Sequence, residues 1–183
     1  MEKKALFHFS IFTLFGFSTI GYIILFFHKE LLFWDLFKVE NPISTSVYGL
    51  GLGVVVALLG LMLLKLNIFN KVNDVFSKMI KDLNLQWYHI LFYSFCAGVG
   101  EEILFRGAIQ AYIHIWPTAI IFVLLHGYVN PKDLKTSIYG VFLILVSAGF
   151  GYMMKYWGIY AAMSAHFIYD VIMFSYLKYY NNK

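Results

Sequence analysis

Ionisable residues stand inside apolar stretches of this sequence, where such residues are rare. Six of them fall in three separate runs: Glu101, Glu102, Arg106, His126, His166 and Asp170. A charged side chain at the bilayer centre costs about 2.5–3.5 kcal/mol on insertion scales, so it persists where it pairs, lines a cavity or does chemistry. Carboxylates and histidines together can act as general acids and bases on a water molecule.

The spacing of these residues predicts which of them share a helix face. Glu102 and Arg106 are four apart and should form an ion pair, whereas Glu101 is rotated by about 100° and points elsewhere. One carboxylate is then neutralised locally and the other is free. His166 and Asp170 are also four apart, so they present an imidazole and a carboxyl on one stripe.

The composition indicates an all-α, polytopic membrane protein. Apolar residues make up 61% of the 183 positions and charged residues 13%, with a mean hydropathy of +0.71. A spanning helix needs about 20 apolar residues. We therefore expect about six transmembrane helices in one bundle, over Ala5–Phe27, Ser46–Leu66, Trp87–Ile115, Pro117–Tyr128, Ser137–Tyr156 and Ile159–Tyr179.

The chain reads as a single membrane domain, 1–183, in three parts. Residues 1–66 supply two spans without motifs, 67–86 an amphipathic segment at the interface, and 87–179 a catalytic core of four helices. The fourth span is short for a bilayer, which suggests a tilted or buried helix. Close helix packing is expected at six glycines: Gly98, Gly100, Gly107, Gly149, Gly151 and Gly158.

The lysines predict the orientation of the bundle, because positive charge favours the cytoplasmic side of short loops. With both termini cytoplasmic, ten lysines fall inside (3, 4, 65, 71, 78, 81, 132, 135, 178 and 183) and three outside (29, 38 and 155). The lysines form no basic stripe, so we expect no nucleic-acid partner. The lysine- and asparagine-rich, six-span character favours a bacterial inner (cytoplasmic) membrane.

Three short motifs carry a resemblance to a known family. Residues 101–106 resemble an EExxxR motif, 122–126 an FxxxH motif, and 166–170 a histidine followed four positions later by Asn or Asp. In this order and on separate helices, they resemble the CAAX prenyl protease and bacteriocin-processing (CPBP, Abi) family of intramembrane proteases. The resemblance covers about Trp87 to Tyr179. The chain is shorter than the eight-span eukaryotic prenyl-protein proteases and carries Asp170 where those enzymes have Asn.

The resemblance implies peptide-bond hydrolysis by a membrane endopeptidase, with a glutamate and a histidine activating water. Glu101 would be the general base and His126 would share its water. His166 would stabilise charge on the scissile carbonyl, and Asp170 would orient His166 or complete that site. Substrates would be membrane-associated proteins, including prenylated proteins and proteins with sorting signals. The Glu102 and Arg106 pair would only support the helix.

Two questions stay open at the level of sequence. No cofactor is expected, but Glu101, His126 and His166 would also suit a zinc ion, although no HExxH or other dedicated metal-binding spacing is present. The same residues are compatible with a proton-coupled transporter, or with a non-catalytic immunity or binding protein on this scaffold. A transporter relay needs a path to both faces, whereas these groups cluster at one level.

Overall fold

The computed structural model describes residues 3–28 and 31–180, and every regular element within these ranges is a helix. A helix with the bounds expected for the sixth span is present, and the helices at the other expected spans begin and end within four residues of the predicted bounds. The helices are α1 Lys3–Phe12, η1 Thr13–Phe17, α2 Ser18–Phe26, η2 Phe33–Phe37, α3 Pro42–Leu64, η3 Asn67–Phe69, α4 Asn70–Asp82, α5 Trp87–Glu102, η4 Ile103–Ile109, α6 Gln110–Ile113, α7 Ile115–Leu125, α8 Leu134–Trp157 and α9 Ile159–Tyr179.

Within the described ranges, three stretches are long and apolar enough to cross a bilayer: Lys3–Phe26, Pro42–Leu64 and Leu134–Trp157. The ionisable residues of α9 and of the run from α5 to α6 make these helices less apolar. Helix α7 has 11 residues, or about 16 Å of length, which is shorter than a bilayer core of about 30 Å. The protein is a helical membrane bundle, and the count of six crossings stays a prediction.

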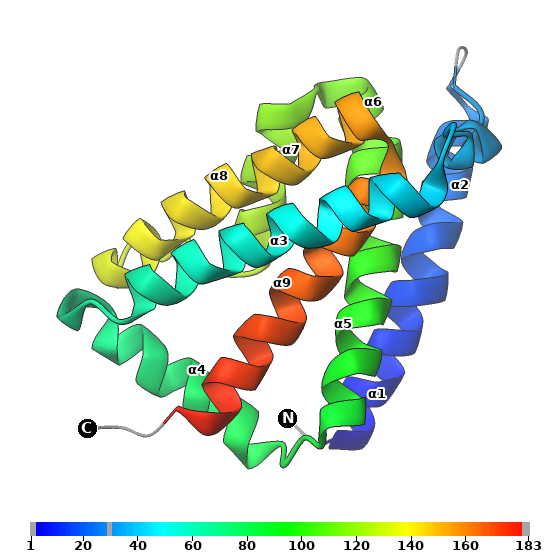
Figure 1. Ribbon diagram of the computed structural model, residues 1–183. Coiled ribbons are helices and arrows are strands. Elements are labelled where there is room, and N and C mark those ends of the chain that lie inside the picture. Colours follow the sequence, from blue (N-terminus) through cyan, green and yellow to red (C-terminus); the bar gives the residue numbers. More distant parts are fainter. Residues whose placement is uncertain (1–2, 29–30, 181–183) are drawn as a thin grey trace.

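Helix α9 lies at the centre of the bundle, with α3 and α5 packed against it (Figure 1). The contact with α3 depends on two glycines. A Cβ atom added to Gly49 would collide with the backbone carbonyl of Ala161, and one added to Gly53 would lie 2.5 Å from the carbonyl oxygen of Ala165. The backbones therefore approach closely, as small residues allow in membrane helices.

Helix α5 packs between α9 and the continuous amino-terminal helix formed by α1, η1 and α2. The predicted glycine contacts are partly present. A Cβ atom on Gly100 would collide with the carbonyl of Thr13, and one on Gly98 would lie 3.0 Å from the carbonyl oxygen of Met163. The expectation for Gly149 was wrong, because a Cβ atom there would have no atom within 4 Å. The third expected span also ends early, since His114 has a φ of 64° that breaks the helix before α7.

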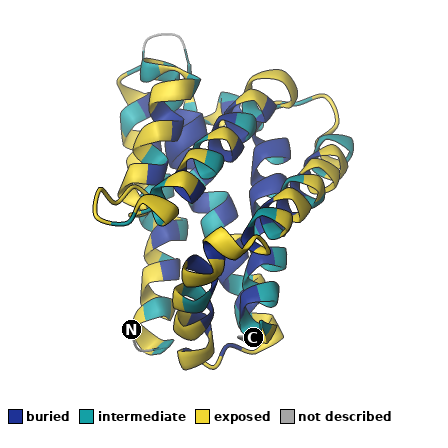
Figure 2. Ribbon diagram, turned by 90° about the vertical axis from the view of Figure 1, so that its left-hand side faces the viewer, coloured by how far each residue is buried: buried dark blue, intermediate teal, exposed yellow. Residues whose placement is uncertain are grey.

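The burial pattern fits a bundle in lipid. Figure 2 shows buried residues on the inward faces of the helices and exposed residues on the outward faces. Many of the exposed residues are large and apolar, including Phe26, Ile43 and Met62. Such a surface is suited to contact with acyl chains rather than with water.

Helix α4 lies across the end of the bundle where α1 begins and α9 ends (Figures 1 and 2). It is amphipathic, as predicted, and its buried face includes Val72 and Ile80. On its outer side, Lys71 Nζ lies 3.0 Å from Asp133 Oδ2, in the turn before α8. This ion pair lowers the pKa of the Asp133 carboxyl below its ordinary value, chiefly through the hydrogen bond from Lys71.

Candidate active site

The two adjacent glutamates at the end of α5 have different surroundings. The Glu102 side chain is fully buried, whereas the Glu101 side chain is 13% exposed and lines a cavity. This difference follows from the rotation of about 100° between neighbouring positions on a helix. The two side chains therefore point in different directions, as the spacing predicted, with Glu102 inside the packed bundle and Glu101 on the cavity.

Glu102 forms the predicted ion pair with Arg106, whose Nη1 lies 3.0 Å from Glu102 Oε1. Arg106 lies in η4, a π-helical stretch that begins directly after Glu102. π-helical segments inside α-helices are frequent at functional sites. Nη2 of Arg106 donates hydrogen bonds to Ser147 Oγ at 2.8 Å and to the Ser147 carbonyl oxygen at 3.3 Å. The guanidinium carbon also lies 4.5 Å from the ring centre of Phe122. Arg106 thus connects the end of α5 with α7 and α8.

Glu102 also contacts His166, which the sequence analysis did not predict. Nδ1 of His166 lies 2.8 Å from Glu102 Oε1, so the imidazole N–H at that position donates to the carboxylate. We expected Asp170 to orient His166 or to complete the oxyanion site; the hydrogen bond at Nδ1 comes from Glu102 of α5. Glu102 therefore holds the imidazole of α9 directly, in addition to pairing with Arg106.

His126 is oriented by the backbone of its own helix. Its Nδ1 lies 2.7 Å from the carbonyl oxygen of Phe122, which can only accept, so Nδ1 carries the proton. Nε2 is then directed into the site and lies 3.7 Å from Glu101 Oε2. The Phe122 ring packs against the imidazole with ring centres 4.3 Å apart. Phe122 therefore positions the His126 imidazole through both its carbonyl oxygen and its ring.

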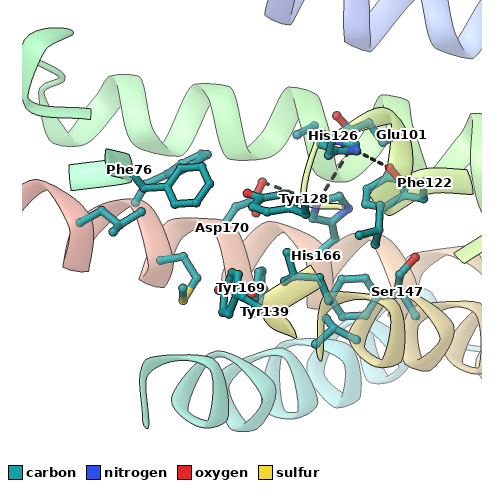
Figure 3. Close-up of a pocket in the computed structure, with 18 of the residues that line it drawn as sticks. Phe76, Glu101, Phe122, His126, Tyr128, Tyr139, Ser147, His166, Tyr169 and Asp170 are labelled. Carbon is teal, nitrogen blue, oxygen red and sulfur yellow. Dashed lines mark hydrogen bonds and ion pairs between the residues drawn. The ribbon is translucent and has the colours of Figure 1, made fainter. Parts of the chain in front are cut away.

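The side chains converge on the free carboxylate (Figure 3). Glu101 Oε2 lies 3.7 Å from Nε2 of His126 and 3.9 Å from Nε2 of His166. Asp170 Oδ2 approaches the same nitrogen of His166, at 3.6 Å. Four groups from α5, α9 and the end of α7 thus surround one point inside the bundle, although the motifs lie up to 69 positions apart in the sequence.

A cavity of about 290 Å³ opens onto this point. Glu101, His126, His166 and Asp170 line one part of it, and apolar side chains line most of the rest. Three tyrosines, at positions 128, 139 and 169, also border it. A mostly apolar cavity with a few convergent polar groups is the usual form of a ligand site.

A zinc ion would require three donor atoms around one position. Among the residues of 3–28 and 31–180, no group of three His, Cys, Asp or Glu side chains is arranged to hold a metal ion. The donors closest to such a set are Glu101, His126 and His166, whose facing atoms are separated by the distances given above.

Comparison with known proteins adds to this geometry. Residues 83–172 match the family model described as type II CAAX prenyl endopeptidase Rce1-like. This segment is therefore similar to the Rce1-like family, as the motifs predicted. The Rce1-like segment contains the six ionisable residues of the three motifs. It runs from the residue after α4 into α9. The family is a protease family, which agrees with a catalytic interpretation of the site.

One curated protein to which this chain is similar is the uncharacterized protein YpbD of Bacillus subtilis (strain 168). It is 33% identical over 87 residues, which make up 46% of this chain and 43% of YpbD. The chain thus covers less than half of the length of this relative. No solved structure matches the chain.

Two residues that contribute to the site, Ser147 and Tyr128, were not predicted from the sequence. Ser147 is a common residue type in a membrane helix and belongs to none of the three motifs, so nothing in the sequence singles it out. Tyr128 lies two positions after His126, with its ring 6.5 Å from the imidazole and nearly parallel to it. Its position two residues after the motif histidine was the one signal available.

Proposed function

We propose that this protein is an intramembrane endopeptidase that cleaves a membrane-associated protein, including prenylated or sorting-signal substrates. The observation that carries the proposal is the Glu101 carboxylate, which faces Nε2 of both His126 and His166 inside a cavity of the bundle. The similarity of the matched segment to a protease family supports the same activity.

Glu101 and His126 would hold the attacking water. The 3.7 Å between Glu101 Oε2 and His126 Nε2 is too long for a direct hydrogen bond, but one water oxygen can hydrogen-bond to both groups. The water oxygen then forms a bond to the scissile carbonyl carbon, and Glu101 takes its proton. Because Nδ1 of His126 is committed to the Phe122 carbonyl, Nε2 is the atom free to orient the water.

His166 would stabilise the oxyanion that forms on the carbonyl oxygen. Glu102 fixes the ring through Nδ1, so Nε2 is held toward the reacting centre. In its imidazolium form His166 has a second N–H, at Nε2, which donates to the oxyanion. Glu101 then returns its proton to the leaving nitrogen, the carbon–nitrogen bond breaks, and a carboxylic acid and an amine are released.

The test is cleavage of internally quenched peptides by the purified protein in proteoliposomes. Wild-type protein is expected to cleave, and Glu101→Gln, which keeps the shape but removes the base, is expected to fold and not to cleave. Cleavage by Glu101→Gln at a near-native rate would refute the proposed mechanism. If wild-type protein cleaved nothing but carried protons or solutes across the liposome membrane, the transporter interpretation would replace this one.

The same assay tests whether a metal ion takes part. We expect a strong chelator to leave the activity unchanged. If the chelator abolished cleavage and zinc restored it, the water would be activated by a metal ion, and Glu101 would be a ligand or proton shuttle instead.

A further inference from the structure

The cavity at the catalytic groups continues along α9 into an apolar arm. We use this name for the part lined by Leu64, Phe76, Met79, Ile80, Met173, Phe174 and Leu177. None of these seven side chains carries a charge or a strong hydrogen-bonding group. In Figure 3, Phe76 lies at the end opposite Glu101, with Asp170 and Tyr128 between them. The arm and the catalytic groups thus belong to one continuous space.

The cavity is long enough to receive several residues of a substrate. Its lining on α9 extends from His166 to Leu177, and 11 helical steps correspond to about 16 Å, of which the arm takes the part from Met173 onward. An extended peptide advances about 3.3–3.6 Å per residue, so about four or five residues fit this length. The arm begins at Met173, about 10 Å along α9 from His166, so residues about three to five positions from the cleaved bond would lie against it.

Helix α4 forms the outer wall of the arm through Phe76, Met79 and Ile80. It ends at Asp82, directly before the segment that matches the Rce1-like family, and so lies outside that segment. Side-chain contacts hold α4 at both ends. Lys71 pairs with Asp133, and Lys81 Nζ donates to the carbonyl of Tyr180. The wall is thus an element that this chain places over the family's catalytic core.

We propose that α4 determines the substrate specificity of the enzyme by admitting apolar side chains about three to five positions from the cleaved bond and excluding charged ones. This inference depends on the proposed peptidase activity. A lysine or aspartate side chain in the arm would lose its hydration without gaining a partner, which is strongly unfavourable. Leucine, methionine and phenylalanine side chains gain by burial there. Phe76 and Met79 are the side chains of α4 that select apolar over charged side chains of the substrate.

A reversal of charge preference gives the sharpest test. Met79 lines the arm and is 47% exposed, whereas Val75 is 57% exposed, lies one turn earlier on α4 and does not line the arm. Both positions should accept aspartate without loss of the fold, which melting in detergent would verify. The substrates are quenched peptides in which each position within about five residues of the cleaved bond is varied between Leu and Lys.

Wild-type protein is expected to prefer Leu over Lys by at least about tenfold in kcat/KM at one of these positions. Met79→Asp should reduce or reverse that preference by about tenfold, because a carboxylate in the arm pairs with the lysine of the peptide. Val75→Asp should keep the wild-type preference, which separates an effect inside the arm from general attraction to a negative helix.

Three results would overturn the inference. Cleavage by wild-type protein without any Leu preference would refute the role of α4 while leaving the peptidase activity intact. Equal shifts in Met79→Asp and Val75→Asp would assign the effect to surface charge. Absence of cleavage by wild-type protein on every peptide would remove the proposed function together with this inference.

Discussion

Oxygen Oε1 of Glu102 lies 2.8 Å from Nδ1 of His166 and 3.0 Å from Nη1 of Arg106. One fully buried carboxylate oxygen therefore holds an imidazole from α9 and a guanidinium from its own helix. The two groups have different tasks, since Arg106 fixes α8 through Ser147 and His166 faces the cavity. Glu102 links the stability of the bundle to the geometry of the site.

The first prediction contrasts the two adjacent glutamates. Glu102→Gln leaves Arg106 buried beside a neutral amide, which is expected to cost about 3–5 kcal/mol of stability and to lower activity as well. Glu101→Gln is expected to abolish activity with little change in the melting temperature, because Glu101 faces the cavity. Melting in detergent and the peptide assay measure both effects. Equal melting temperatures for the two variants would contradict the role assigned to Glu102.

The second prediction concerns Arg106 and its partner on α8. Arg106→Ala strands the Glu102 charge and should destabilise the protein by about 3–5 kcal/mol. Ser147→Ala removes one hydrogen bond to a charged group and should cost less, about 1.5–3 kcal/mol. Unfolding in detergent should give this order. The double variant Glu102→Leu with Arg106→Met should lose less stability than the sum of the losses in Glu102→Leu and Arg106→Met measured separately. Simple additivity of these two losses would argue against coupling of the pair.

The third prediction separates the two ionisable residues of α9. His166→Ala should lower kcat by about 10²- to 10³-fold, the usual effect of removing one oxyanion donor. Asp170→Asn should be milder, because Asp170 lies 3.6 Å from His166 and does not form the hydrogen bond that orients the ring. Steady-state kinetics on one peptide would compare them. A larger loss for Asp170→Asn than for His166→Ala would exchange their proposed roles.

The fourth prediction is a pH dependence at the attachment of α4. Lys71 lowers the pKa of Asp133 in the folded protein below the ordinary value of 3.8. The pair therefore stabilises the fold fully above that value, and the effect fades as pH falls through the lowered pKa. Lys71→Met should melt slightly below wild type at pH 7, and the gap should close in strong acid. Lys78→Met, an exposed lysine of the same helix, is the control and should show no such pH-dependent gap.

The fifth prediction is the orientation of the bundle. The lysine distribution predicts that both termini are cytoplasmic, although Lys29 and Lys183 of that count lie outside the described residues. The beginning of α1 and the end of α9 lie at the same end of the bundle, which agrees with termini on one side (Figure 1). A reporter enzyme fused to the carboxyl terminus should be active only in the cytoplasm. Activity outside the cytoplasm would reverse the orientation.

The sequence by itself determined the features that depend on neighbours along one helix. The apolar runs predicted the helical membrane fold, because about 20 apolar residues are needed to cross a bilayer. The four-residue spacing predicted the pairing of Glu102 with Arg106, since positions four apart meet on any α-helix. The three motifs predicted the family. Each of these inferences needs only the geometry of a single helix.

The tertiary structure decided how the helices are turned toward one another. Glu102 and His166 lie 64 positions apart, and no local rule fixes the rotation and height at which α5 and α9 meet. The π-helical stretch at Arg106, its contact with Ser147 and the position of α4 over the cavity depend on the same packing. Contacts between helices follow from the shapes of whole faces packed together, so only the folded bundle could reveal them.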